Sequence, residues 1–168
     1  MAELSMNPTN EEKFEIALKS GDIKAIHEAA VSINYIIPRE LRTSLWSILL
    51  LGPNADEEVK LGEQMLNKVS DNDIDAFIDH RVIAQDVNRT RAEISYFKNS
   101  EAQMWMRRAL TTFCGDQSTT FEYMQGLNEI LAPFCLLDAV PNSDTLNDDD
   151  EPELVLSKPP GALHFCLF

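Results

Sequence analysis

The stretch that decides the fold reads IAQDVNRT, from Ile83 to Thr90, and a second short stretch, YMQGLNEI, follows from Tyr123 to Ile130. Around both stretches, apolar residues recur at intervals of three and four, the spacing that places side chains on one face of an α-helix. The pattern is strongest between Ser100 and Gly115. No segment shows the alternation of a half-buried strand, so the sequence predicts an all-α protein.

Start and stop signals outline the other helices. Thr9 with Glu12 and Ser100 with Gln103 have the spacing of a capping box, and Asp22 can cap a helix of its own. Pro133 should kink the last confident helix. The expected helices span about residues 10–19, 23–33, 38–51, 55–69, 100–115 and 125–137.

Arg89 and Gln125 are the side chains in the two stretches that suit phosphoryl transfer. That reaction asks little covalent chemistry of a protein, so catalysis rests on placing the attacking water and neutralising developing charge. A planar, permanently charged guanidinium does the second, and an amide does the first. The pair has the chemistry of accelerated GTP hydrolysis, which makes Arg89 a candidate arginine finger and Gln125 a candidate glutamine finger.

Each stretch taken alone has a plainer interpretation. Asp86 and Arg89 stand three residues apart, which is typical of an ion pair on a solvated helix face. Gln125 before Gly126 is typical of a helix end or a turn. Only the combination of the two stretches favours catalysis.

The combined pattern resembles a known family, the TBC domain of Rab GTPase-activating proteins. Three motifs carry the resemblance: I-x-x-D-x-x-R, Y-x-Q-G-x-N and, upstream, R-x-x-x-W. The residues that match them are Ile83, Asp86 and Arg89, then Tyr123, Gln125, Gly126 and Asn128, then Arg42 and Trp46.

This resemblance implies an all-helical domain that inserts Arg89 and Gln125 into the active site of a bound Rab-family GTPase. Ile83, Asp86, Tyr123, Gly126 and Asn128 would support the two catalytic loops. Arg42 and Trp46 would be structural. The apolar neighbours of Trp46 on its predicted helix also place it in a core.

The resemblance also suggests a domain organisation. Residues 1–35 would form an N-terminal helical extension, and residues 36–168 a TBC domain cut to its N-terminal half, because the family domain is longer. A polar, acidic segment over about 141–158 reads as a flexible loop.

Charge and composition limit the partners. The net charge of -14 disfavours nucleic acid and unassisted docking on anionic lipid. No apolar run is long enough to span a bilayer, and no signal peptide opens the chain, so we expect a cytoplasmic protein that reaches endomembranes through its GTPase, with a role in vesicle trafficking.

No site for a metal or a nucleotide is expected. The acidic stretch from Asp71 lacks the glycine and the final glutamate of a calcium loop, and the three histidines are scattered. Cys114, Cys135 and Cys166 have no C-x-x-C spacing and read as buried thiols. Any GTP and Mg²⁺ would belong to the partner GTPase.

Two function classes remain open. The first is a GTPase-activating protein that supplies Arg89 and Gln125 in trans. The second is a non-catalytic helical interaction module, or an inactive truncated form of the same domain.

Overall fold

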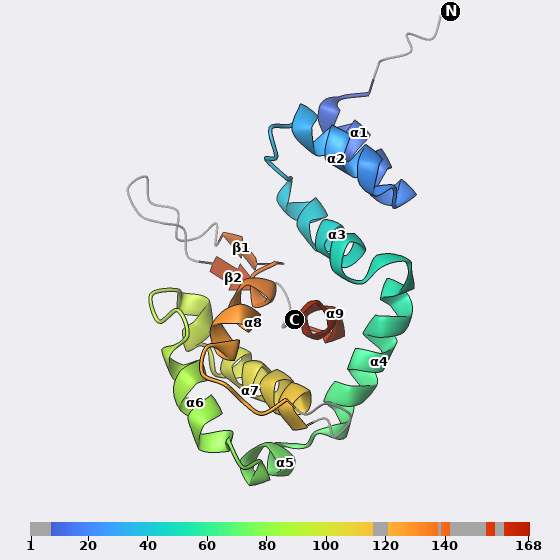
Figure 1. Cartoon of the computed structure of the whole chain (residues 1–168). Coiled ribbons are helices and arrows are strands. Elements are labelled where there is room, and N and C mark those ends of the chain that lie inside the picture. Colours follow the sequence, from blue (N-terminus) through green and yellow to red (C-terminus); the bar gives the residue numbers. More distant parts are fainter. Residues whose placement is uncertain (1–7, 116–120, 138, 142–153, 157–159) are drawn as a thin grey trace, which may run out of the picture. The chain divides into compact units, whose positions relative to one another are not determined.

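The structure, a computed structural model, describes residues 8–115, 121–137, 139–141, 154–156 and 160–168 (Figure 1). The chain divides into two compact units, Met1–Ala55 and Asp56–Phe168. Helices dominate both units, so the predicted all-α class is confirmed. Each unit is described by itself.

The first unit holds three helices and a short 3-10 turn. They are α1 (Asn10–Ser20), α2 (Ile23–Ser32), α3 (Arg39–Leu50) and η1 (Gly52–Asn54). The predicted capping box is present, since Thr9 and Glu12 each accept a hydrogen bond from the other's backbone N–H. Asp22 caps α2 as predicted. A small core centred on the fully buried Phe14 joins the three helices.

One face of α3 packs on that core, and the other does not. Leu41, Leu45 and Ile48 lie against it. Trp46 falls on a different side of the helix and keeps 40% of its surface exposed, so the prediction of a core tryptophan is wrong. Arg42 is also exposed, and its Nε donates to the carbonyl oxygen of Ile37, 3.2 Å away, just before its own helix.

The second unit is a helical cluster around α7. Its elements are α4 (Ala55–Lys68), α5 (Asp71–Ala76), α6 (His80–Arg89), η2 (Ser95–Lys98), α7 (Ser100–Gly115), α8 (Leu127–Cys135), β1 (Ala139–Pro141), β2 (Leu154–Leu156) and α9 (Ala162–Leu167). Helix α7 contacts α5, α6, α8 and η2. The fully buried Ile83, Met106, Leu110 and Leu131 show that α6, α7 and α8 share one core.

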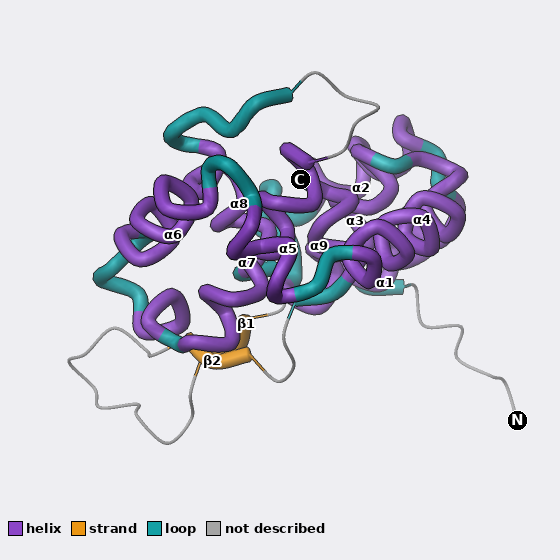
Figure 2. The backbone as a smooth tube through the Cα atoms, turned by 90° about the horizontal axis from the view of Figure 1, so that it is seen from below, coloured by secondary structure: helices purple, strands orange, loops and turns teal. Residues whose placement is uncertain are grey.

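Two short strands correct the expectation of a chain without strands. Strands β1 and β2 pair antiparallel, with Val140 opposite Val155 (Figure 2). Each has three residues, too few for an alternating pattern to be recognised in sequence. Most of the acidic loop expected over 141–158 lies outside the described residues.

Two other predicted boundaries are corrected. Asn99 caps α7 in place of Ser100, because its Oδ1 accepts from the Glu101 N–H at 2.8 Å and asparagine is at least as good a cap as serine. The last predicted helix is shorter than expected: α8 ends two residues after Pro133. The stretch from Asp71 forms α5, and Asp73 forms a capping box with Ser70.

Helices α4 and α9 approach each other closely at a glycine. A Cβ added to Gly62 would collide with Sγ of Cys166 and lie 3.2 Å from Phe165. The thiol of Cys166 also donates to the carbonyl oxygen of Glu58, 3.1 Å away. Cys114 and Cys135 are buried as predicted, whereas Cys166 is only partly buried.

Candidate functional site

The first motif is the C-terminal half of α6. Ile83 and Val87 are fully buried in the core, and Asp86 lies on the same side of the helix with 4% of its surface exposed. Arg89 is the last residue of α6, and 69% of its side chain is exposed. The helix therefore buries its carboxylate and presents its guanidinium to solvent.

The buried carboxylate of Asp86 receives a donor on each oxygen. Arg89 Nη2 donates to Oδ1, and the Tyr123 hydroxyl donates to Oδ2 at 2.9 Å. A buried carboxylate is costly unless it is paired and hydrogen-bonded, and both conditions are met here. The ion pair that the plain interpretation predicted is present, but its carboxylate is buried and only its guanidinium faces solvent.

A second set of hydrogen bonds joins the motifs through Asn128. Its Nδ2 donates to the hydroxyl of Thr90 at 2.9 Å and to the backbone oxygen of Asp86 at 3.3 Å. The Thr90 hydroxyl itself donates to the same Asp86 oxygen at 2.9 Å. Thr90 is 1% exposed and Asn128 is also buried, so water does not compete for these bonds.

The same asparagine fixes the turn that carries Gln125. Oδ1 of Asn128 accepts from the backbone N–H of Gly126, 3.2 Å away. Gly126 caps α8 with a φ of 104°, a conformation that favours glycine. Gln125 was expected to begin the helix; instead it lies in the turn before Gly126, and it is exposed.

Electrostatics around the network keep its donors in place. Burial, followed by the hydrogen bond to Asp86, raises the pKa of Tyr123, so its hydroxyl stays protonated and can donate. Beyond the network, Arg91 Nε pairs with Glu129 Oε2 at 2.8 Å. Both of these side chains are about half exposed, so the pair is a weak second link between the motifs.

The structure brings six of the seven residues of the two motifs into this arrangement or the core beneath it. They are Ile83, Asp86, Arg89, Tyr123, Gly126 and Asn128. Gln125 is held through its neighbour Gly126. Sequence reasoning missed Thr90, whose hydroxyl accepts a hydrogen bond from Asn128, 38 residues further along the chain, because no local pattern distinguishes it from an ordinary helix-end threonine.

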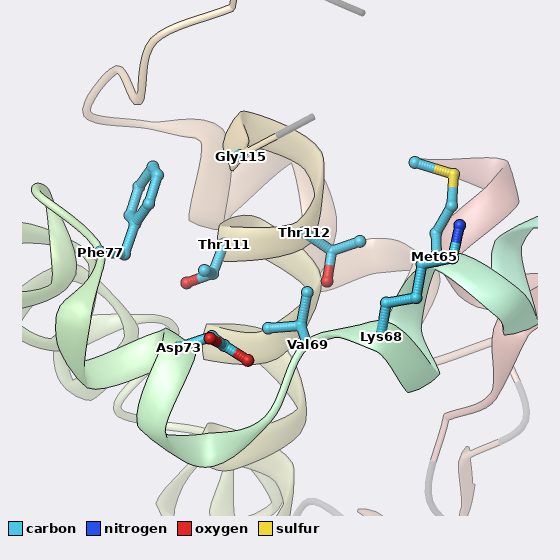
Figure 3. Close-up of a pocket in the computed structure, with 8 residues that line it drawn as sticks. All are labelled: Met65, Lys68, Val69, Asp73, Phe77, Thr111, Thr112 and Gly115. Atoms are coloured by element: carbon cyan, nitrogen blue, oxygen red, sulfur yellow. The ribbon is translucent and has the colours of Figure 1, made fainter. Parts of the chain in front are cut away.

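The exposed motif side chains lie outside the pocket that opens between α4, α5 and α7 (Figure 3). That pocket, of about 600 Å³, is lined by Met65, Lys68, Val69, Asp73, Phe77, Thr111, Thr112 and Gly115. None of these residues belongs to either motif. Within the described ranges, no group of three or more His, Cys, Asp or Glu side chains could hold a metal ion. Arg89 and Gln125 are exposed, and neither lines this pocket.

The fold and this arrangement define a class: a helical protein that exposes an arginine and a glutamine from two motifs joined by hydrogen bonds. The model of the Rab-GTPase-TBC domain family matches residues 39–152. The chain therefore belongs to the Rab-GTPase-TBC domain family. No curated protein and no solved structure matched the chain in the corresponding comparisons. In the part of the chain that the structure describes, no helix is long and apolar enough to cross a membrane.

Proposed function

We propose that this chain is a GTPase-activating protein for a Rab-family small GTPase and that it supplies Arg89 and Gln125 in trans. Family membership gives the kind of partner. One observation carries the assignment of residues: the buried network of Asp86, Thr90 and Asn128 joins the two motifs, while Arg89 and Gln125 remain exposed beside it. Burying these polar groups costs free energy, which their hydrogen bonds offset. In return the network fixes the separation of the two motifs, as two side chains acting on one substrate would require.

Arg89 would neutralise charge on the phosphate oxygens of the partner's GTP. A guanidinium has five N–H donors, and the bond from Arg89 Nη2 to Asp86 uses one of them, so other donors can serve a ligand. Asp86 would orient the side chain, and its own carboxylate would be held by Tyr123. The Mg²⁺ and the nucleotide would be the partner's.

Gln125 would place the water that attacks the γ-phosphate. Its amide offers both a donor and an acceptor, as this task requires. Rigidity of the turn comes from the bond between Gly126 and Asn128. Together the two fingers would contribute by positioning and by charge, with no covalent step on this chain.

The test is single-turnover hydrolysis by a panel of GTP-loaded Rab proteins, with and without the chain. We expect at least one GTPase to be accelerated, and Gln125→Ala to remove most of that acceleration. Gln64→Ala, which removes an exposed glutamine of α4, is the matched control and should keep the rate. Binding without acceleration by the native chain would place the protein in the class of non-catalytic interaction modules.

A further inference from the structure

The surface beside Gln125 carries large apolar side chains that the second unit does not bury. Met124 and Ile130 are each 57% exposed, and Phe121 is about half exposed. Phe121 is held from behind by Phe113, at a ring-centroid distance of 5.4 Å. Single exposed apolar residues are ordinary, but three within ten residues of a catalytic candidate form a surface that calls for a partner.

Geometry requires that a partner cover this surface if Gln125 acts on its nucleotide. A glutamine that orients a water must reach within hydrogen-bond distance of it, so the protein around that water comes within a side chain's length of the turn. Met124 is adjacent to Gln125 in sequence, and Ile130 bonds through its N–H to the carbonyl oxygen of Gly126 at 3.1 Å. Both side chains are therefore attached to the backbone that positions Gln125.

Charge near the other motif points to the same partner face. Arg89 lies at the end of α6 with 69% of its side chain exposed, whereas the Asp86 carboxylate that pairs with it is buried. The exposed member of this ion pair is therefore the cation. An exposed cation favours a partner region with negative charge, such as one that holds nucleotide phosphates.

We infer that Met124 and Ile130 form an apolar docking surface for the face of the GTPase next to its nucleotide, and that they supply affinity while Arg89 and Gln125 supply rate. This inference rests on the proposed function. The partner face is accordingly apolar where it meets Met124 and Ile130, and negative where it meets Arg89. A GTPase with a polar residue at that apolar contact binds more weakly, so this surface selects among partners.

The test substitutes glutamine, a good helix former that puts a polar amide in place of the apolar side chain. Met124→Gln and Ile130→Gln are compared with Leu61→Gln, a change at a similarly exposed apolar residue on α4. Circular dichroism and thermal unfolding confirm that each sample is folded. Affinity for a Rab loaded with a non-hydrolysable GTP analogue is measured by calorimetry, and the Rab with the highest affinity for the native chain is used for kinetics.

We expect Met124→Gln and Ile130→Gln to weaken binding by about 10-fold or more each, because each variant replaces apolar surface that the complex would bury with a polar amide. KM should rise in step, kcat should stay within about 2-fold of the native value, and Leu61→Gln should behave as the native chain.

Two results overturn the inference. Native affinity in both glutamine variants refutes the docking surface alone, and an accelerated native reaction in the same experiment leaves the proposed function standing. Absence of both binding and acceleration for the native chain refutes the docking surface and the proposed function together. Binding that is native-like in Leu61→Gln and lost in the other two supports the docking surface; if no GTPase is accelerated in that case, the proposed function alone is refuted.

Discussion

Removing the Thr90 hydroxyl tests the network that joins the two motifs. Thr90→Val keeps the shape of the side chain but removes the donor to the Asp86 oxygen and the acceptor for Asn128 Nδ2. A buried hydrogen bond contributes about 0.5 to 1.5 kcal/mol, and an orphaned buried donor costs about 1 to 3 kcal/mol. We therefore expect a loss of about 1 to 3 kcal/mol in the free energy of unfolding.

That loss is large enough to measure. At about 2 to 4 °C for each kcal/mol in a protein of this size, the Tm of Thr90→Val should fall by several degrees. Thr112→Val is the matched control: Thr112 is also buried, but its hydroxyl donates only to the Arg108 carbonyl oxygen, one turn back in the same helix. The control should lose no more than about 1.5 kcal/mol.

Kinetic measurements show whether the Thr90 hydroxyl positions the two motifs or only stabilises the fold. Small misplacements of catalytic groups can cost about 100-fold in rate, so Thr90→Val should lower kcat by about 10- to 100-fold with little change in KM. Thr90→Ser keeps the hydroxyl and should recover most of the rate. The reasoning is refuted if Thr90→Val unfolds and reacts like Thr112→Val, or if Thr90→Ser is no better than Thr90→Val.

Two further predictions concern packing and pH. Gly62→Ala should destabilise the second unit by about 1 to 3 kcal/mol, since the added Cβ would collide with Cys166. Gly115→Ala is the control, because its added Cβ would lie 3.7 Å from Phe77, and it should be neutral or stabilising. The Tm values of the two variants are compared. Burial raises the pKa of Cys114 to about 11 and that of Cys135 to about 12, from 9.0 for a free thiol. These thiols favour folding below pH 9 and lose that contribution as pH rises through the folded values, so urea unfolding should show stability falling between about pH 9 and pH 12. A flat profile across that range would contradict the burial of the two thiols.

Local sequence rules predicted what depends on neighbouring residues. Thr9, Glu12 and Asp22 form their caps because a cap involves residues two or three positions apart. The Asp86 and Arg89 pair follows from the same short spacing. The predicted start of a helix was wrong where two neighbouring residues are both good N-caps, as at Asn99 and Ser100.

Distant contacts could not be read from the sequence. The bonds from Tyr123 and Asn128 to Asp86 span 37 and 42 residues, and no periodicity encodes them. Burial of Asp86 was likewise hidden, because a carboxylate at a helical i,i+3 spacing usually faces solvent. The family resemblance predicted which side chains belong to the site, and the structure shows that hydrogen bonds of Thr90 and Asn128 join the two motifs.

The most direct measurement of the central claim is the single-turnover rate of one responsive GTPase with the native chain, Arg89→Lys and Arg89→Ala, with affinity measured on the same samples. An arginine finger contributes roughly 10³ to 10⁵ in rate, so Arg89→Ala should lose most of the acceleration while binding persists. Arg89→Lys should recover little, because a point charge cannot bridge phosphate oxygens as a guanidinium does. Acceleration that survives intact in Arg89→Ala would contradict the account.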